Sequence, residues 1–164
     1  KNDKIMCALY RPGHFEGVLA VINQFLQRFK PKCIFFGEKD YQQLFLIKKF
    51  IKNKFKTKIF SCSTIRDKNK LALSSRNILL SGNDIKKSSF ISKLLLKFKH
   101  KIKKNIYLKK DIDNIIFKIN SIKNIKIEYL EIRNKNTLSK NYNKNNFKVF
   151  LAYYNKKIRL IDNY

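Results

Sequence analysis

The sequence is poor in the residues that build metal centres and disulfide frameworks. Its three cysteines, Cys7, Cys33 and Cys62, lie far apart without a Cys-x-x-Cys pair, and His14 is the only histidine near any of them. This spacing fits neither a zinc site nor a disulfide framework, and it favours reduced thiols. The chain also lacks an apolar run long enough to span a membrane, and its start shows no signal-peptide pattern. We therefore expect a cytoplasmic protein without a metal site of its own.

Acidic residues are scarce, with 11 Asp and Glu against 38 Lys and Arg and a formal net charge of +27. Such an excess normally suggests a nucleic acid or an anionic membrane as partner. Arginine is scarce too, at 6 Arg against 32 Lys, although bidentate recognition of phosphate favours Arg. The abundance of Lys, Asn, Ile and Phe together is typical of an A+T-rich genome. We favour compositional drift, and keep a cationic nucleic-acid-binding module as the alternative.

The first part of the chain alternates between helical and extended patterns. Apolar residues at helical spacing predict helices over residues 17–29 and 44–55, and short apolar runs predict strands at 33–36 and 58–62. Helix, strand, helix and strand with short connections indicate a parallel α/β sheet. Two strands cannot bury both faces of such a sheet, so we expect further strands from elsewhere.

Beyond a polar loop at residues 64–70, the pattern changes. Helices are predicted over 85–104 and 111–122, the second with Asp111 as N-cap, and strands over 125–132, 147–154 and 157–161. Two helices and three strands suggest a small α+β domain. We therefore divide the chain into residues 1–65 and 66–164.

Two short motifs carry the chemistry. At the end of the predicted strand 33–36, Gly37 would let a ligand approach the backbone, Lys39 offers a positive charge, Asp40 can accept from ribose hydroxyls, and Gln43 follows one helical turn later. Ligands of open α/β sheets bind at this end of the strands. A solvated turn is the alternative for this motif taken alone.

The second motif is Ser74-Ser75-Arg76, a contiguous set of hydroxyl and guanidinium donors suited to a polyphosphate. Taken alone it also fits a helix cap followed by a surface arginine.

Several contiguous motifs together resemble one known family. They are Arg-Pro-Gly-His-Phe-Glu-Gly-Val at 11–18, Phe-Gly-Glu-Lys-Asp-Tyr-Gln-Gln-Leu at 36–44, Leu-Ala-Leu-Ser-Ser-Arg-Asn at 71–77, Tyr-Leu-Glu-Ile at 129–132 and Arg-Leu-Ile-Asp-Asn at 159–163. In this order they are similar to the pantothenate synthetase family, also called pantoate–beta-alanine ligases. The resemblance covers essentially the whole chain.

The resemblance implies a nucleotidyltransferase-superfamily enzyme with a partial Rossmann-like parallel sheet and a smaller α+β domain that closes over the site. The family uses ATP and Mg²⁺ to convert pantoate into a pantoyl adenylate, which beta-alanine then attacks to give pantothenate and AMP. No specific nucleic acid or membrane partner is implied, and pairing into homodimers is left open. A fragment of another superfamily member, such as a cytidylyltransferase or an aminoacyl-tRNA synthetase, is a further alternative.

The resemblance also implies residue roles. Gly37, Glu38, Lys39 and Asp40 would contact ATP, and Gln43 would hold pantoate. Ile65 would meet the adenine through its backbone. The phosphate-gripping loop would comprise Leu73, Ser74, Ser75 and Arg76. Lys39 and Arg76 would be the catalytic residues.

The chain departs from the family pattern in four respects. It has no H-x-G-H segment, since the Arg-Pro-Gly-His run carries one histidine and precedes a different helix, and no upstream pantoate-binding Gln is present. Asn69 and Lys70 replace the usual Asp-Gly, and Leu73 replaces a frequent Met. We expect a C-terminal portion of the enzyme that alone binds ATP weakly and adenylates little or nothing.

Overall fold

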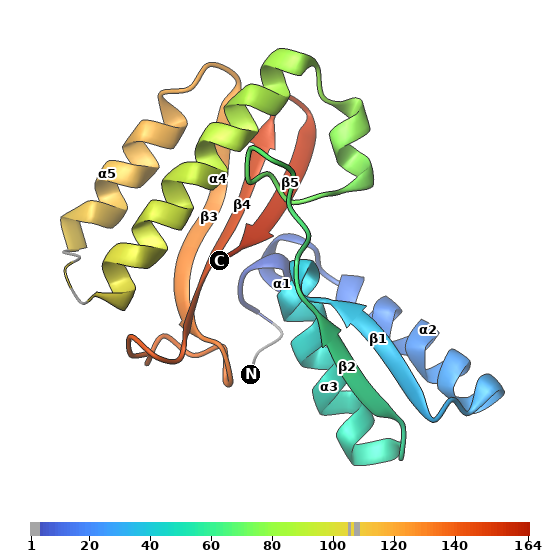
Figure 1. Ribbon diagram of the computed structural model, residues 1–164. Coiled ribbons are helices and arrows are strands. Elements are labelled where there is room, and N and C mark those ends of the chain that lie inside the picture. Colours follow the sequence, from blue (N-terminus) through green and yellow to red (C-terminus); the bar gives the residue numbers. More distant parts are fainter. Residues whose placement is uncertain (1–3, 105, 107–108) are drawn as a thin grey trace. The chain divides into compact units, whose positions relative to one another are not determined.

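The computed structural model describes residues 4–104, 106 and 109–164 (Figure 1). The chain divides into two compact units, Lys1–Thr64 and Ile65–Tyr164. Within the described residues, no helix combines the length and the apolar character needed to cross a membrane.

The first unit is a small parallel α/β structure. Its elements are α1 (Cys7–Tyr10), α2 (His14–Phe29), β1 (Cys33–Gly37), the 3₁₀ turn η1 (Glu38–Asp40), α3 (Tyr41–Lys54) and β2 (Lys58–Cys62). β1 and β2 pair in parallel, with Phe35 opposite Phe60 and Gly37 opposite Cys62. The predicted parallel α/β arrangement is confirmed.

Helix α2 begins earlier than its apolar pattern suggests. The spacing predicts a start at Gly17, but the helix begins at His14, directly after Gly13. Gly13 has φ 77°, a left-handed conformation that glycine adopts without a steric penalty. Apolar periodicity therefore misses the first turn, whose start is set by the turn residues rather than by the buried face.

The sheet of the first unit is covered on one face. Leu26, Ile47 and Ile51 form a core that also contacts Ile34 and Ile59. The opposite face carries Phe35 and Phe60, which are 66% and 48% exposed and stack with ring centroids 5.2 Å apart. As expected, two strands leave one apolar face of the sheet open.

The second unit is an antiparallel sheet with helices on one face (Figure 1). Its elements are η2 (Ser75–Leu79), α4 (Gly82–Lys103), α5 (Lys109–Asn120), β3 (Ile125–Asn134), β4 (Phe147–Asn155) and β5 (Ile158–Asn163), and the strand order is β3-β4-β5. Leu95 and Phe98 of α4 and Ile119 of α5 pack with Val149 and Leu151 of β4 in one core. The predicted two helices and three strands are confirmed.

The predicted N-cap of the second helix is wrong. Helix α5 begins at Lys109, so Asp111 lies within its first turn. There it forms an ion pair with Lys101 of α4 at 3.2 Å. Asp favours both the cap and the first turn of a helix, because either position faces the positive end of the helix dipole.

Candidate functional site

The first candidate group lies at the carboxyl end of β1. Gly37 is the last residue of the strand, and η1 and α3 follow without a loop. Its φ of −71° suits any residue, and a Cβ added there would meet no atom within 4 Å. The fold itself therefore does not require glycine at this position. The absence of a side chain at Gly37 leaves the backbone there accessible.

Charged residues follow Gly37 within one turn. The Lys39 ammonium lies 3.9 Å from the Asp40 carboxylate, and their side chains are 19% and 50% exposed. Burial, and to a smaller extent the charge of Glu38, raises the pKa of the Tyr41 hydroxyl above its usual value. Lys39 is thus held partly buried beside carboxylates at the start of α3.

The two neighbouring glutamines of α3 have different surroundings. Gln42 is buried, and its amide accepts from the Cys7 N–H at 3.0 Å and donates to the Ile5 carbonyl at 2.9 Å. Gln43 is half-buried, and its side chain has no hydrogen-bond partner among the described residues of the first unit. Gln42 therefore fixes the segment before α1, whereas the amide of Gln43 is available to a ligand.

The second candidate group follows a small hairpin in the second unit. The predicted polar loop contains an antiparallel bridge between Arg66 and Ala72, and the Leu73 N–H donates to the Ile65 carbonyl at 3.0 Å. The Asp67 carboxylate accepts from the Leu71 N–H at 2.9 Å, which closes the turn. The predicted polar loop at residues 64–70 thus forms the first arm and the turn of this hairpin. The Ile65 side chain is 71% exposed, while its carbonyl is engaged in the hairpin.

The three polar residues after the hairpin lie at the surface. Ser74 caps η2, since its hydroxyl accepts from the Arg76 N–H at 3.3 Å. Ser75 and Arg76 are exposed, and the Arg76 guanidinium has no partner within the described part of its unit. Leu73 is 53% exposed. The helix-cap alternative therefore describes Ser74 correctly, while the donors of Ser75 and Arg76 point to solvent.

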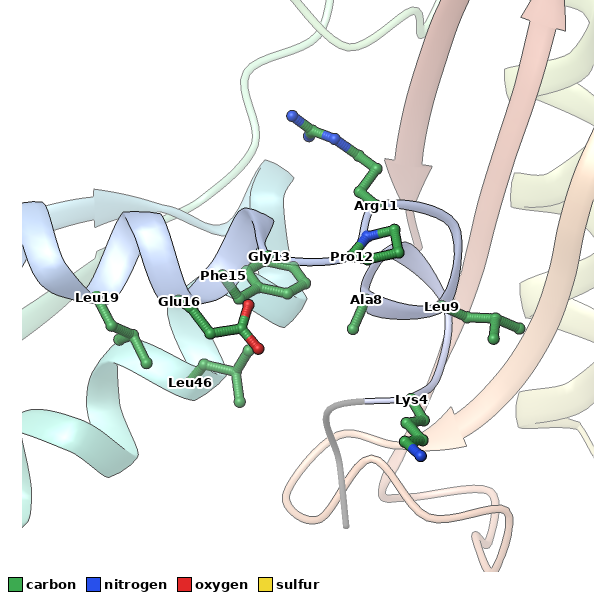
Figure 2. A pocket seen from close by; sticks show the side chains of 10 residues that line it. All are labelled: Lys4, Ala8, Leu9, Arg11, Pro12, Gly13, Phe15, Glu16, Leu19 and Leu46. Carbon is green, nitrogen blue, oxygen red and sulfur yellow. The ribbon is translucent and has the colours of Figure 1, made fainter.

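Two cavities of the first unit lie away from these residues. One, of about 450 Å³, lies around the turn between α1 and α2, and Arg11 extends away from the other side chains that line it (Figure 2). The other, of about 1050 Å³, lies at the amino ends of β1 and β2 and is lined by five lysines among other residues. Ligands of α/β sheets bind at the carboxyl ends of the strands, so neither cavity is our candidate site.

Metal-binding side chains do not cluster in the described residues, where no group of three or more His, Cys, Asp or Glu could hold an ion. All three cysteines are free thiols, and Cys33 and Cys62 are exposed.

Comparison with known proteins identifies the family. The Pantoate-beta-alanine ligase family matches residues 1–164. The pantothenate synthetase of Francisella philomiragia is 39% identical over 155 residues, which are 94% of this chain and 51% of that protein.

Two solved structures share the fold. Pantothenate synthetase from Thermus thermophilus superposes with a TM-score of 0.88 at 27% identity, over 99% of this chain and 60% of that one. Pantoate-beta-alanine ligase from Francisella tularensis, complexed with beta-gamma ATP and beta-alanine, gives a TM-score of 0.79 at 36% identity, over 99% of this chain and 54% of that one. This chain therefore spans little more than half the length of the relatives it matches, and its fold is that of the nucleotidyltransferase superfamily. The chain belongs to the pantoate-beta-alanine ligase family.

Proposed function

We propose that this chain supplies ATP and pantoate contacts for the ATP-dependent condensation of pantoate with beta-alanine. The observation that carries the proposal is the carboxyl end of β1, where Lys39 of η1 and Gln43 in the first turn of α3 are four residues apart. The Francisella tularensis relative, 36% identical, is complexed with beta-gamma ATP and beta-alanine, which supports these ligand classes. Residues 1–65 would then be part of the nucleotide-binding domain and 66–164 the smaller domain.

Each unit contributes contacts of its own. In the first, the open backbone at Gly37 lets ATP approach, Gly37 and Asp40 lie near the ribose, Glu38 also contacts ATP, and Lys39 binds the phosphates. In the second, residues 73–76 grip the phosphates and the Ile65 backbone meets the adenine. The exposed hydroxyl of Ser75 and guanidinium of Arg76 support this assignment.

The reaction needs cations because two anions must meet. The pantoate carboxylate attacks the α-phosphorus of ATP, and the bond to pyrophosphate breaks. The amine of beta-alanine then attacks the acyl carbon and loses a proton, and the bond to AMP breaks. Lys39 and Arg76 neutralise the charge that develops on the phosphates, and Gln43 orients pantoate for in-line attack. The ATP phosphates would hold Mg²⁺, which would supply further positive charge to this neutralisation. The free thiols suit a reducing cytoplasm.

Pantoate-dependent release of pyrophosphate from ATP and Mg²⁺ tests the proposal. We would measure it on this chain, and on this chain fused to the portion of the Francisella philomiragia relative that it does not match. Turnover is expected in the fusion and little or none in the chain alone. Lys39→Ala should lower kcat in the fusion. The expected loss of transition-state stabilisation is about 2.7–4 kcal/mol, as for the removal of one preorganised donor. Gln43→Ala should raise KM for pantoate more than KM for ATP.

Lys49→Ala is the control, because Lys49 is an exposed lysine of α3, the helix that directly follows η1 and Lys39, and should leave turnover unchanged. An unchanged kcat in Lys39→Ala would reject the role of Lys39, and equal effects of Gln43→Ala on both KM values would reject the pantoate assignment. Family-like turnover by this chain alone would reject its dependence on the further portion. No turnover in the fusion, with tight and steeply salt-dependent binding of unrelated DNA, would favour the cationic nucleic-acid module.

A further inference from the structure

An ion pair that the proposed chemistry does not use lies at the base of the second candidate group. Arg66 donates from Nη1 to Asp162 Oδ2 at 2.8 Å and from Nη2 to Asp162 Oδ1 at 2.9 Å. The same two nitrogens donate to the Lys70 and Asn163 carbonyls, each at 3.0 Å. A guanidinium is suited to this fork, because its planar donors match both carboxylate oxygens at once.

The pair is built into the sheet of the second unit. The Asp162 side chain is 6% exposed and that of Arg66 is 17% exposed. The Tyr164 hydroxyl donates to Asp162 Oδ2 at 2.8 Å, and the Arg66 guanidinium lies 4.5 Å from the centroid of the Tyr164 ring. Burial would lower the pKa of Arg66, but the hydrogen bond and charge of Asp162 outweigh it and raise that pKa. Arg66 is therefore a charged group fixed to β5.

The hairpin connects this fixed point to the exposed donors. Arg66 pairs with Ala72 across the hairpin, and the Leu73 N–H bonds to the Ile65 carbonyl. On the far side of the donors, the Asn77 side-chain amide donates back to the Ala72 carbonyl at 3.0 Å. Residues 73–76 therefore lie between two contacts of Ala72, its bridge to Arg66 and the hydrogen bond that its carbonyl accepts from Asn77.

We propose that Arg66 and Asp162 are positioning residues that hold residues 73–76 in the conformation that receives the triphosphate of ATP. This inference rests on the proposed function. Donors aimed at an anion lower a barrier most when they are already in place, because ordering them during the reaction costs free energy. Neither residue contacts ATP itself; both act through the hairpin.

A second ion pair of the same sheet offers a matched control. Arg159 of β5 binds Glu128 of β3 through Nε at 3.1 Å, and these side chains are 15% and 9% exposed. Both pairs join an arginine to a carboxylate and are similarly buried, but only Arg66 belongs to the hairpin. Glu128→Gln therefore imitates a general loss of one buried ion pair.

The first readout is hydrogen exchange of this chain without nucleotide. Asp162→Asn should speed exchange of the Leu71 and Leu73 amides by about tenfold or more, the effect of losing a charged hydrogen bond. Arg66→Lys should do the same, because an ammonium keeps the charge but cannot form the fork. Glu128→Gln should leave these two amides unchanged.

The second readout is kinetic and uses the form that turns over in the pyrophosphate assay. Asp162→Asn and Arg66→Lys should raise KM for ATP by about tenfold, with KM for pantoate unchanged, whereas Glu128→Gln should change neither. Unaltered exchange rates at Leu71 and Leu73 would show that the Arg66–Asp162 pair does not hold the hairpin. A rise in KM for ATP no larger than that in Glu128→Gln would overturn the positioning role. If no form turns over, the proposed function fails and the positioning role fails with it, while the exchange result still decides whether the anchor exists.

Discussion

Single residues of the hairpin show where this sequence carries local strain. Lys70 has φ 72°, in the left-handed region that favours glycine, and its N–H bonds to the Asp67 carbonyl at 2.9 Å. The resemblance noted in the sequence analysis places the Gly of the Asp-Gly pair at this position. The departure noted in the sequence thus falls where a side chain is least favourable.

Lys70→Gly should therefore stabilise the protein. A non-glycine residue in the left-handed region costs roughly 1–2 kcal/mol, part of which the greater freedom of glycine in the unfolded chain offsets, so a gain of about 1 kcal/mol in the free energy of unfolding is expected. Urea unfolding measures it. Lys68→Gly is the control, because Lys68 is an exposed lysine of the same turn without a positive φ. An equal change in both variants would contradict the strain argument.

At the scale of an element, the start of α4 is tied to the β4–β5 turn by a single carboxylate. Asp84 accepts from the Ser81 hydroxyl and the Lys156 ammonium, each at 2.6 Å. Hydrogen bonds from Lys156 and Ser81 lower the pKa of Asp84 from 3.8 to about 2. The Asn155 side chain donates to the Asp84 carbonyl at 3.1 Å, which joins the same two elements again.

This carboxylate should make stability depend on pH in acid. Because the folded pKa of Asp84 lies below its unfolded value, its contribution is complete above about pH 4 and is lost as the pH falls to about 2. The difference in unfolding free energy between the unaltered chain and Asp84→Asn should therefore shrink over that window, as followed by urea unfolding at several pH values. Asp113→Asn, which removes an exposed carboxylate of α5, should show a smaller dependence. If the difference in unfolding free energy for Asp84→Asn did not change with pH, the lowered pKa of Asp84 would be contradicted.

Most elements could be predicted from the sequence because their apolar residues follow one periodicity, as in α3 and β4. The start of α2 could not, since it depends on the left-handed Gly13 rather than on a buried face. The hairpin could not either, because the residues of its turn, 66–70, are polar and its support comes from Asp162. In the candidate site, the motifs located Lys39 and Gln43, but Arg66 escaped because no local pattern connects it to β5. The different surroundings of Gln42 and Gln43 were equally invisible, although both follow the same short motif.

At the scale of the whole molecule, apolar residues on the two faces of the first unit's sheet differ in burial. Ile47 is fully buried under the covered face, whereas Phe60 on the opposite face is 48% exposed. A parallel sheet is normally covered on both sides, so Phe60 contributes less to this chain than its size suggests.

Phe60→Ala should accordingly cost less than about 1.5 kcal/mol of unfolding free energy, the upper range for its aromatic stack with Phe35. Ile47→Ala should cost about 2–5 kcal/mol, as for other large-to-small core changes. Urea unfolding of the two variants under the same conditions checks the comparison. A cost for Phe60→Ala equal to that for Ile47→Ala would show that its face is packed in solution.

The ribosome synthesises the two residues of the Arg66–Asp162 ion pair at different times. The two residues are 96 positions apart, and Asp162 lies in the final strand, β5. At a synthesis rate of roughly 5–20 residues per second, the ribosome completes the partner roughly 5–20 s after Arg66 itself. During that interval residues 73–76 have been translated but the carboxylate that binds Arg66 has not. A pause in translation before β5 would therefore lengthen the time that the hairpin spends without the Asp162 carboxylate.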